Sequence, residues 1–310
     1  MTNRIIDIEV GKLMAVTDLH GNWQDYRRSK EQFASLNKDG NADICVFLGD
    51  IIHAYPDQED RSKEIIDDLM ALGTNKPGSP YIAVMGGHEM APVYHMNLFK
   101  QDKDTGIPYE FSKAFEDAIK DDRQKYVDFL KDMPFAVRTA GGVLLLHAGA
   151  TQIIGEDRQE AYKVTYQSFS NWDHDAMLRQ LVMTAERMGE PIQTDDFNPS
   201  LGKHLEDNWT GKVLWEFFMN SNERGSQGVN YFSHIPGFLK FMGTGHPGLD
   251  MMVTGHLAVK KGVQVVCDEQ LRISSSLGAV SDLDKHLLLF GASKRYENAD
   301  ELAKNCRWLY

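Results

Sequence analysis

The sequence predicts an α/β fold of two packed mixed β-sheets flanked by helices, and three observations carry this prediction. In the N-terminal part, short apolar runs alternate with amphipathic helical patterns, an order typical of parallel strands joined by helices. The C-terminal part is richer in β-runs, some of them paired across short turns as hairpins. Polar residues, mostly Asp and His, stand directly behind several of the apolar runs.

The N-terminal elements follow from apolar periodicity and from capping residues. Asn22 is the expected N-cap of the first helix, and Gly73 the expected C-terminal stop of the second. Strands are expected at Lys12–Thr17, Asp43–Gly49 and Tyr81–Gly86, and helices at Trp23–Leu36 and Asp60–Leu72. This order predicts that the three strands pair in parallel, with their carboxyl ends along one edge, where ligands bind in such sheets.

The remaining elements alternate between helices and hairpins. Helices are expected at Tyr109–Ile119 and Arg123–Met133, and the stretch from about 156 to 220 is expected to be mostly helical. Strands are expected at Phe135–Thr139, Val143–His147, Met251–Thr254, Gly262–Asp268, Gln270–Ser275 and, as the last strand, His286–Phe290. We predict a single domain over residues 1–310, with the stretch 156–220 as a helical cap or insert.

Composition narrows the classes of partner. The chain has 310 residues, of which 42% are hydrophobic, enough for a large core, and a formal net charge of −12. A negative surface disfavours nucleic acid and anionic membranes as partners. No apolar run approaches the roughly 18 residues that span a bilayer, and Met1–Val10 carries acids and no signal-peptide core, so we expect a cytoplasmic protein. The three cysteines form no C-x-x-C pair.

Five short segments place a metal-binding type of residue at the end of an apolar run. They are Asp18-Leu-His20-Gly-Asn22, Gly49-Asp50, Gly86-Gly-His88-Glu89, His147-Ala-Gly149 and Gly255-His256. Taken singly, each has a plainer interpretation, such as a helix cap, a turn or a buried core histidine. Together they predict one metal centre, because carboxylate and imidazole are the ligands that Mn, Fe and Zn share.

The segments predict a centre for two metal ions. Asp18 and His20 lie one residue apart at a strand end and are expected to hold the first ion. Asp50 has two carboxylate oxygens and is expected to bridge both ions, while His147 and His256 hold the second. Two cations that share a water activate it near neutral pH and stabilise an in-line displacement at phosphorus. The predicted chemistry is therefore hydrolysis of a phosphoester.

The ordered motifs resemble those of the calcineurin-like metallophosphoesterases, in particular the phosphoprotein phosphatase branch, over about residues 14 to 277. Leu214-Trp215-Glu216 and Asn222-Glu223-Arg224-Gly225 also resemble a stretch of that family. The resemblance implies a sandwich of two mixed sheets with the metals at one edge. It also implies two divalent ions (Mn first, with Fe or Zn as alternatives), His88 as the proton donor to the leaving group and Arg224 as a phosphate ligand.

The chain departs from the family pattern at four positions. Gly87 stands where the family has an Asn that binds the second metal, so that site is expected to be weakened. His53 replaces the carboxylate that orients the catalytic histidine, and Ala54 and Met85 replace two phosphate-binding arginines. We considered Asp57 and Glu59 as substitutes for the carboxylate, with exposed loop charges as the plainer interpretation. Replacing Gly87 with Asn is expected to raise the affinity for the second ion.

These observations predict a metal-dependent phosphatase that hydrolyses a phosphomonoester by in-line attack of a metal-bound hydroxide. The substrate is expected to be a phosphoprotein or a small-molecule or biosynthetic phosphate, and the oligomeric state stays open. Two alternatives remain: a dinucleoside polyphosphate or pyrophosphate hydrolase, and a pseudo-phosphatase that binds metal and a phosphorylated ligand without turnover. The long helical stretch adds the hypothesis that its Met, Trp and Phe side chains select an apolar-bodied substrate, against the plainer interpretation that they form core.

Overall fold

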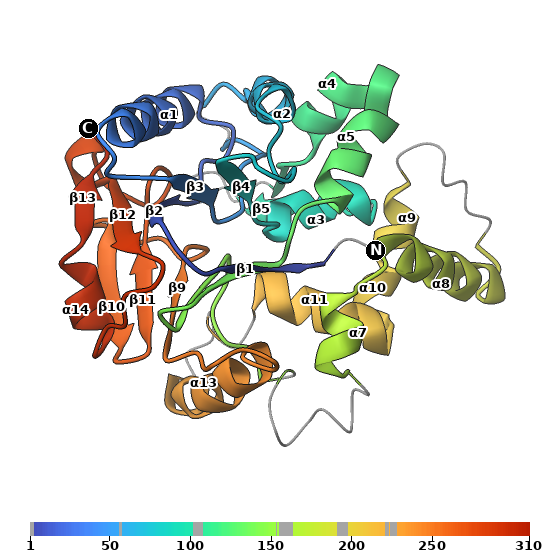
Figure 1. Ribbon diagram of the computed structural model, residues 1–310. Coiled ribbons are helices and arrows are strands. Elements are labelled where there is room, and N and C mark those ends of the chain that lie inside the picture. The colour runs from blue at the N-terminus through green and yellow to red at the C-terminus, as the bar shows by residue number, and fades with distance from the viewer. Residues whose placement is uncertain are drawn as a thin grey trace.

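The computed structural model describes residues 3–55, 58–101, 108–152, 154, 164–190, 198–220, 223 and 228–310. Within them the chain builds two mixed sheets with helices outside, as predicted (Figure 1). None of the helices in these ranges combines the length and the apolar character needed to cross a bilayer.

The five-stranded sheet contains the three parallel strands expected from the sequence. Its order is β13-β12-β2-β3-β4, with β2–β3 and β3–β4 parallel and β12 antiparallel to both of its neighbours. The strands are β2 (Lys12–Val16), β3 (Ile44–Phe47), β4 (Tyr81–Ala83), β12 (His286–Gly291) and β13 (Cys306–Trp308). The carboxyl ends of β2 and β3 therefore lie side by side.

The six-stranded sheet has the order β1-β7-β8-β9-β11-β10. Its strands are β1 (Ile5–Ile8), β7 (Ala136–Thr139), β8 (Val143–Leu146), β9 (Met251–Thr254), β10 (Val263–Cys267) and β11 (Gln270–Ile273). The two expected hairpins are present as the antiparallel pairs β7–β8 and β10–β11. Strands β8 and β9 pair in parallel, so their carboxyl ends also meet at one edge.

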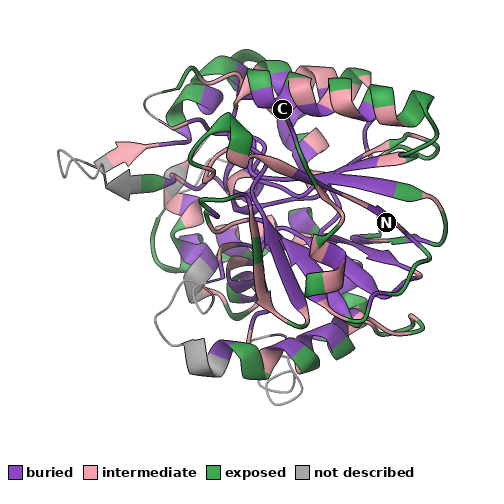
Figure 2. Cartoon of the chain, turned by 90° about the vertical axis from the view of Figure 1, so that its left-hand side faces the viewer, coloured by how far each residue is buried: buried purple, intermediate pink, exposed green. Residues whose placement is uncertain are grey.

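Alternation along each strand divides the core in two. On β2, Leu13 and Ala15 pack in a cluster with residues of both sheets, such as Leu145 of β8, whereas Met14 and Val16 pack with the outer helices. This is the period-two pattern of a strand that is buried on both faces. Figure 2 shows the buried strands in the middle of the molecule and the exposed residues on the outer helices.

Helices cover both outer faces (Figure 1). Asn22 caps α1 as predicted, since its side chain accepts the Asp25 N–H. One side carries α1 (Trp23–Lys38), α2 (Ser62–Ala71), α4 (Lys113–Ile119) and α5 (Arg123–Lys131), with α3 (Gly87–Val93) behind them. The others are α7 (Tyr166–Ser170), α8 (His174–Arg187), α9 (Pro199–Gly202), α10 (His204–Asp207), α11 (Trp209–Met219), α13 (Gly228–Met242) and α14 (Ala299–Ala303), and two short 3₁₀ turns lie at Lys120–Asp122 and Asp282–Asp284. Helices α7 to α11 lie in the stretch expected to form an insert, and its status as a separate cap stays a prediction.

Two expectations for secondary structure were wrong, and one strand was not expected. The helix expected from Tyr109 begins only at Lys113, because Pro108–Glu110 forms β6, which pairs with β5 (Phe99–Gln101). His286–Phe290 is not the last strand, since β13 follows it. Strand β1 was missed because acids interrupt its apolar run. In the fold Asp7 pairs across the strands with Arg138 of β7 at 2.7 and 2.8 Å, which removes the cost of the acid at the sheet edge.

Candidate metal centre

The predicted ligands converge because each follows a strand that shares an edge with a neighbour. Asp18 and His20 follow β2, and Asp50 follows the adjacent parallel strand β3. His147 directly follows β8, and His256 follows β9, the parallel neighbour of β8. The two sheets thus bring residues from all parts of the sequence to one edge of the sandwich, as expected from the position of ligand sites in such sheets.

The side chains form two groups that share Asp50. One group contains His20, Asp50 and His88, and the other contains Asp50, His147 and His256. Within each group the ligand atoms lie within 4.8 Å of one another. From Asp50 Oδ2, the distance is 3.2 Å to His147 Nε2, 3.7 Å to His20 Nε2 and 3.9 Å to His88 Nε2. Asp50 therefore lies between two clusters of nitrogen donors, the position that a bridging ligand requires.

Asp18 lies beside the first group. Its Oδ1 is 3.9 Å from His20 Nε2, and its carboxylate also accepts the backbone N–H of His256 at 3.0 Å and the hydroxyl of Thr17 at 2.5 Å. His88 thus lies nearly as close to Asp50 as His20 does, whereas the family resemblance implies that His88 serves the leaving group. Its assignment as proton donor, and that of Asp18 as ligand, stay predictions.

The backbone at the centre is held in the left-handed region that residues other than glycine rarely adopt. The φ angles are +53° at Asp18, +45° at His20, +49° at Asp50, +69° at His53 and +66° at His256. Each such residue costs of the order of 1–3 kcal/mol, and the cost is tolerated where the surrounding structure imposes it, as at functional sites. Gly49 and Gly86 allow the two loops to touch, since a Cβ on Gly49 would lie 2.7 Å from the Gly86 backbone.

Backbone carbonyls fix the orientation of three imidazoles. His147 Nδ1 donates to Leu48 O at 2.9 Å, His256 Nε2 donates to Met219 O at 3.0 Å, and His20 Nδ1 lies 3.3 Å from His53 O. The opposite ring nitrogens then present lone pairs to the centre, and His147 Nε2 and His256 Nδ1 lie 3.2 Å apart. Two lone pairs at this distance need a proton or a cation between them, and metal-binding histidines are oriented in the same way. The donor set therefore fits a divalent cation.

Burial and charge give these groups displaced pKa values. Burial raises the pKa of Asp18 to about 7, and the nearby Asp50 charge raises it further against the effect of His147. Burial lowers the pKa of His147, but the Asp50 and Asp18 carboxylates outweigh it and raise the pKa to about 9. Burial and the neighbouring His88 lower the pKa of His20 to about 3. Burial thus makes the Asp18 charge costly, and the positive charge of His147 compensates the carboxylates around it.

Glu89, in the motif Gly86-Gly-His88-Glu89, holds the backbone of the centre in place, a role that the sequence does not indicate. Its carboxylate is fully buried and accepts four backbone N–H groups, from Gly86 (2.9 Å), Asp50 (2.8 Å), Ile51 (2.7 Å) and Ile52 (3.1 Å). These bonds fix the loop after β3 and the start of α3 against each other. Glu89 thereby positions Asp50 and His88, and its only signal in the sequence is that it follows the predicted proton donor His88.

His53 takes the position of the carboxylate that the family pattern places beside His88. Its Nδ1 lies 3.2 Å from His88 Nδ1, so the two rings share one proton across this contact. His53 is fully buried, and its Nε2 has no partner among the described residues. Burial, with the His88 and His20 charges, lowers its pKa well below the usual value. A neutral His53 orients the His88 ring without supplying negative charge.

Aromatic rings flank His20 and His88. Tyr55 meets His20 edge-on at 5.4 Å between centroids, and Phe111 meets His88 at 5.2 Å. Tyr55 and Tyr109 both pack on Phe111, and the Tyr109 hydroxyl donates to Ala54 O at 2.6 Å. Ala54 and Tyr55 follow His53, where the family pattern has Arg-Gly, so Ala54 stands at the position of a phosphate-binding arginine and an aromatic residue follows it.

Met219 occupies the space beside Gly87. A Cβ built on Gly87 would overlap the Met219 sulfur, and the next nearest group, Phe218 O, would be 3.5 Å away. The expectation that Gly87→Asn alone strengthens the second site is therefore incomplete, because the Asn side chain and Met219 compete for the same space.

The other predicted residues lie elsewhere. Arg224 and Asp57 fall outside the described residues, so their roles stay predictions. Glu59 is 73% exposed and pairs with Arg61 at 2.9 Å, and Met85 is buried in the core. In the helical stretch, Phe217 and Phe218 pack with Phe135 in the core, so these two side chains are core residues and do not form a substrate pocket.

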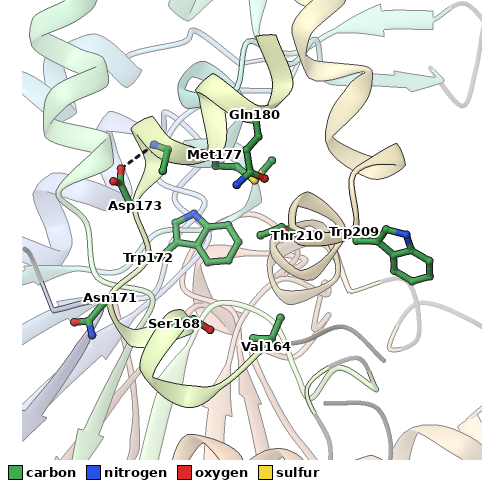
Figure 3. A pocket seen from close by; sticks show the side chains of 10 residues that line it. Val164, Ser168, Asn171, Trp172, Asp173, Met177, Gln180, Trp209 and Thr210 are labelled. Atoms are coloured by element: carbon green, nitrogen blue, oxygen red, sulfur yellow. Dashed lines mark hydrogen bonds between the residues drawn. The ribbon is translucent and has the colours of Figure 1, made fainter. Parts of the chain in front are cut away.

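A pocket of about 600 Å³ lies between α7, α8 and α11 and shares no residue with the two groups (Figure 3). Trp172 and Met177 are among its lining residues, and Asp173 beside them caps α8 by accepting the Ala176 N–H.

Comparison with known proteins agrees with this geometry. The calcineurin-like phosphoesterase family matches residues 11–259. A mutant of a cold-active protein tyrosine phosphatase is 14% identical over 92% of this chain and 76% of its own, with a TM-score of 0.51. The cold-active protein-tyrosine phosphatase of a psychrophilic Shewanella species shows the same identity and coverage with a TM-score of 0.50. A protein serine/threonine phosphatase from Saccharomyces cerevisiae is 14% identical over 93% of this chain and 76% of its own, with a TM-score of 0.49.

At such identities the solved structures show likeness of fold alone, and no curated protein matches the chain. The match over residues 11–259 is different, because it spans most of the sequence and includes all the motifs that meet at the sheet edge. Its members are metal-dependent phosphoester hydrolases, which confirms the family expected from the motifs. This chain belongs to the calcineurin-like phosphoesterase family.

Proposed function

We propose that the protein is a two-metal phosphatase that hydrolyses a phosphomonoester. The observation that supports this most is the pair of donor groups that share Asp50. A single shared carboxylate between two sets of imidazoles is the arrangement that holds two ions close together. Two such ions, when bound, stabilise the charge on the attacking and leaving oxygens of a phosphoryl group and activate water. Mn²⁺ is the first choice of metal, with Fe and Zn as alternatives.

The residues of the chain have separate tasks in this proposal. Asp18, His20, Asp50, His147 and His256 hold the ions, and the carbonyls of Leu48 and Met219 keep two of the imidazoles in the required tautomer. His88 donates a proton to the leaving oxygen, with its ring oriented by His53. Arg224 steadies the phosphate oxygens.

The aromatic side chains around His20 and His88 favour one class of substrate. Tyr55 packs on His20 and Phe111 on His88, and Ala54 replaces an arginine of the family pattern, so these residues offer ring surface and no positive charge. Aromatic faces favour planar or apolar groups over a second phosphate. This favours a phosphomonoester with an aromatic or apolar leaving group, either a small molecule or a phosphorylated protein side chain, over a polyphosphate chain.

Phosphate release from an aryl phosphomonoester tests the proposal. The protein is stripped with chelator and titrated with Mn²⁺, beside Asp50→Asn and the control Asp117→Asn, an exposed surface acid paired with Lys113. We expect metal-dependent turnover in the wild type and in the control, and loss of turnover in Asp50→Asn.

A folded wild type that binds metal and releases no phosphate from aryl, phosphopeptide or small-molecule substrates would contradict the proposal and favour a pseudo-phosphatase. Faster release from dinucleoside polyphosphates than from every monoester would favour the polyphosphate hydrolase instead.

A further inference from the structure

The second donor group lacks one ligand that the family pattern supplies, and Met219 stands in its place. Gly87 offers no side chain, so Asp50, His147 and His256 are the only described His, Cys, Asp or Glu residues that gather there. The space that a side chain of residue 87 would fill is taken by the thioether of Met219. A sulfur atom therefore stands beside the backbone position from which the family pattern supplies an amide oxygen.

Two independent contacts hold Met219 in that place. Its carbonyl accepts the Nε2–H of His256 at 3.0 Å, so the residue is tied directly to the second group. The next residue, Asn220, ends α11 in the left-handed conformation, with φ of +35°. The Asn220 side chain donates to Gly149 O at 2.8 Å and to Ala150 O at 3.0 Å, in the loop that follows His147. The end of α11 is thus anchored on both loops that carry the histidines.

Neighbouring contacts show that the sulfur is the only obstacle in this space. Apart from Met219, the nearest atom to a Cβ on Gly87 would be Phe218 O, at an ordinary contact distance of 3.5 Å. The backbone has left room for a side chain at residue 87, and a side chain from another helix fills it. Met219 is half-buried: it packs against the edge of the core, and its sulfur lies beside Gly87.

We infer that Met219 is a ligand of the second metal ion and gives that site a softer donor set than the family pattern has. The inference rests on the proposed two-metal function and deepens it. A thioether is a neutral, polarisable donor that suits Zn²⁺ better than Mn²⁺ or Mg²⁺, which prefer oxygen. The second site then prefers zinc, while the first, which has only nitrogen and oxygen donors, accepts Mn²⁺.

The test measures metal binding and not turnover. Zinc and manganese are titrated into chelator-stripped wild type, Met219→Leu and the control Met183→Leu, a half-exposed methionine on α8. Leucine keeps the apolar volume and removes only the sulfur. In Met219→Leu we expect the zinc affinity of the second site to fall at least about tenfold. Loss of a residue that only hydrogen-bonds to a metal ligand already costs about that much, so loss of a ligand should cost no less. Manganese affinity should change little.

X-ray absorption of the zinc-loaded protein gives a second readout. We expect sulfur bound to zinc in the wild type and in Met183→Leu, and its loss in Met219→Leu. The double variant Gly87→Asn/Met219→Ala, which restores the amide and clears the space, should shift the preference of the second site towards Mn²⁺.

Absence of sulfur around zinc in the wild type, or unchanged or tighter zinc binding by Met219→Leu, would overturn the inference and leave Met219 as an apolar filler. Either result leaves the proposed function untouched, because that function is tested separately by metal-dependent phosphate release and its loss in Asp50→Asn.

Discussion

Glu89 provides the sharpest test of how the centre is held together, through the substitution Glu89→Gln. The two residues have nearly the same shape, but glutamine has one acceptor oxygen and one NH₂ group. In the structure Oε1 accepts the N–H groups of Ile51 and Ile52, and Oε2 accepts those of Asp50 and Gly86. Whichever way the amide is turned, an NH₂ group faces two backbone donors.

The magnitude follows from this geometry. Two buried N–H groups lose their acceptor, and each costs about 1–3 kcal/mol when left unsatisfied. We therefore expect Glu89→Gln to lower the free energy of unfolding by about 2–6 kcal/mol, a large share of the stability of an ordinary protein. Burial and the Asp50 charge raise the pKa of Glu89 to about 7, so measurements at pH 8 compare the amide with an ionised carboxylate.

Urea denaturation in the presence of chelator measures the effect without a contribution from bound metal. The matched control is Glu64→Gln, whose side chain is 46% exposed and pairs with Arg61 at the surface. Exposed pairs contribute about 0–1 kcal/mol, so this control should unfold almost like the wild type. If Glu89→Gln also stays within about 1 kcal/mol of the wild type, the four N–H groups have other acceptors and the reasoning is wrong.

Three further predictions concern the metals, His53 and a histidine far from the centre. Added Mn²⁺ or Zn²⁺ should stabilise the wild type by about 2.7 kcal/mol at a hundredfold excess over Kd, which calorimetry detects as a higher melting temperature. Asp50→Asn should show no such rise, and equal rises in the two proteins would disprove the bridging role of Asp50. Replacing His53 with Asp places a carboxylate beside His88 Nδ1, so steady-state kinetics should show a higher kcat at similar KM, and a change confined to KM would count against an orienting role. Burial, aided by Arg123 and Lys131, lowers the pKa of His95 to about 4, and its Nδ1 accepts the Asn198 N–H. As the pH falls, the unfolded chain protonates His95 near pH 6.5, whereas the folded chain does so only near pH 4. The neutral ring therefore stabilises the fold fully above pH 6.5, and up to about 3 kcal/mol of the free energy of unfolding is lost as the pH falls towards 4. Urea denaturation from pH 7 to 4 should show a smaller loss in His95→Gln, and identical pH profiles would refute the assignment.

The sequence by itself determined the sheet edge and most of its residues. Apolar runs that end in Asp or His have a simple physical meaning, because parallel neighbours carry their ends to the same place. For this reason the strands before Asp18, Asp50 and His256 could be placed from the sequence, together with the two hairpins. The family followed from the order of these motifs, and the match over residues 11–259 confirmed it.

Only the tertiary structure decided which atoms meet. Strand β1 pairs with β7 over four residues, and Asp7 within it meets Arg138 across the sheet, a pairing between residues that no local pattern connects. The same holds for Met219, which reaches Gly87 from the end of a helix that follows it by more than a hundred residues. Periodicity and motifs report what a residue does within its own element. Long-range packing determines which side chain fills a space left by another, and it is visible only in the folded chain.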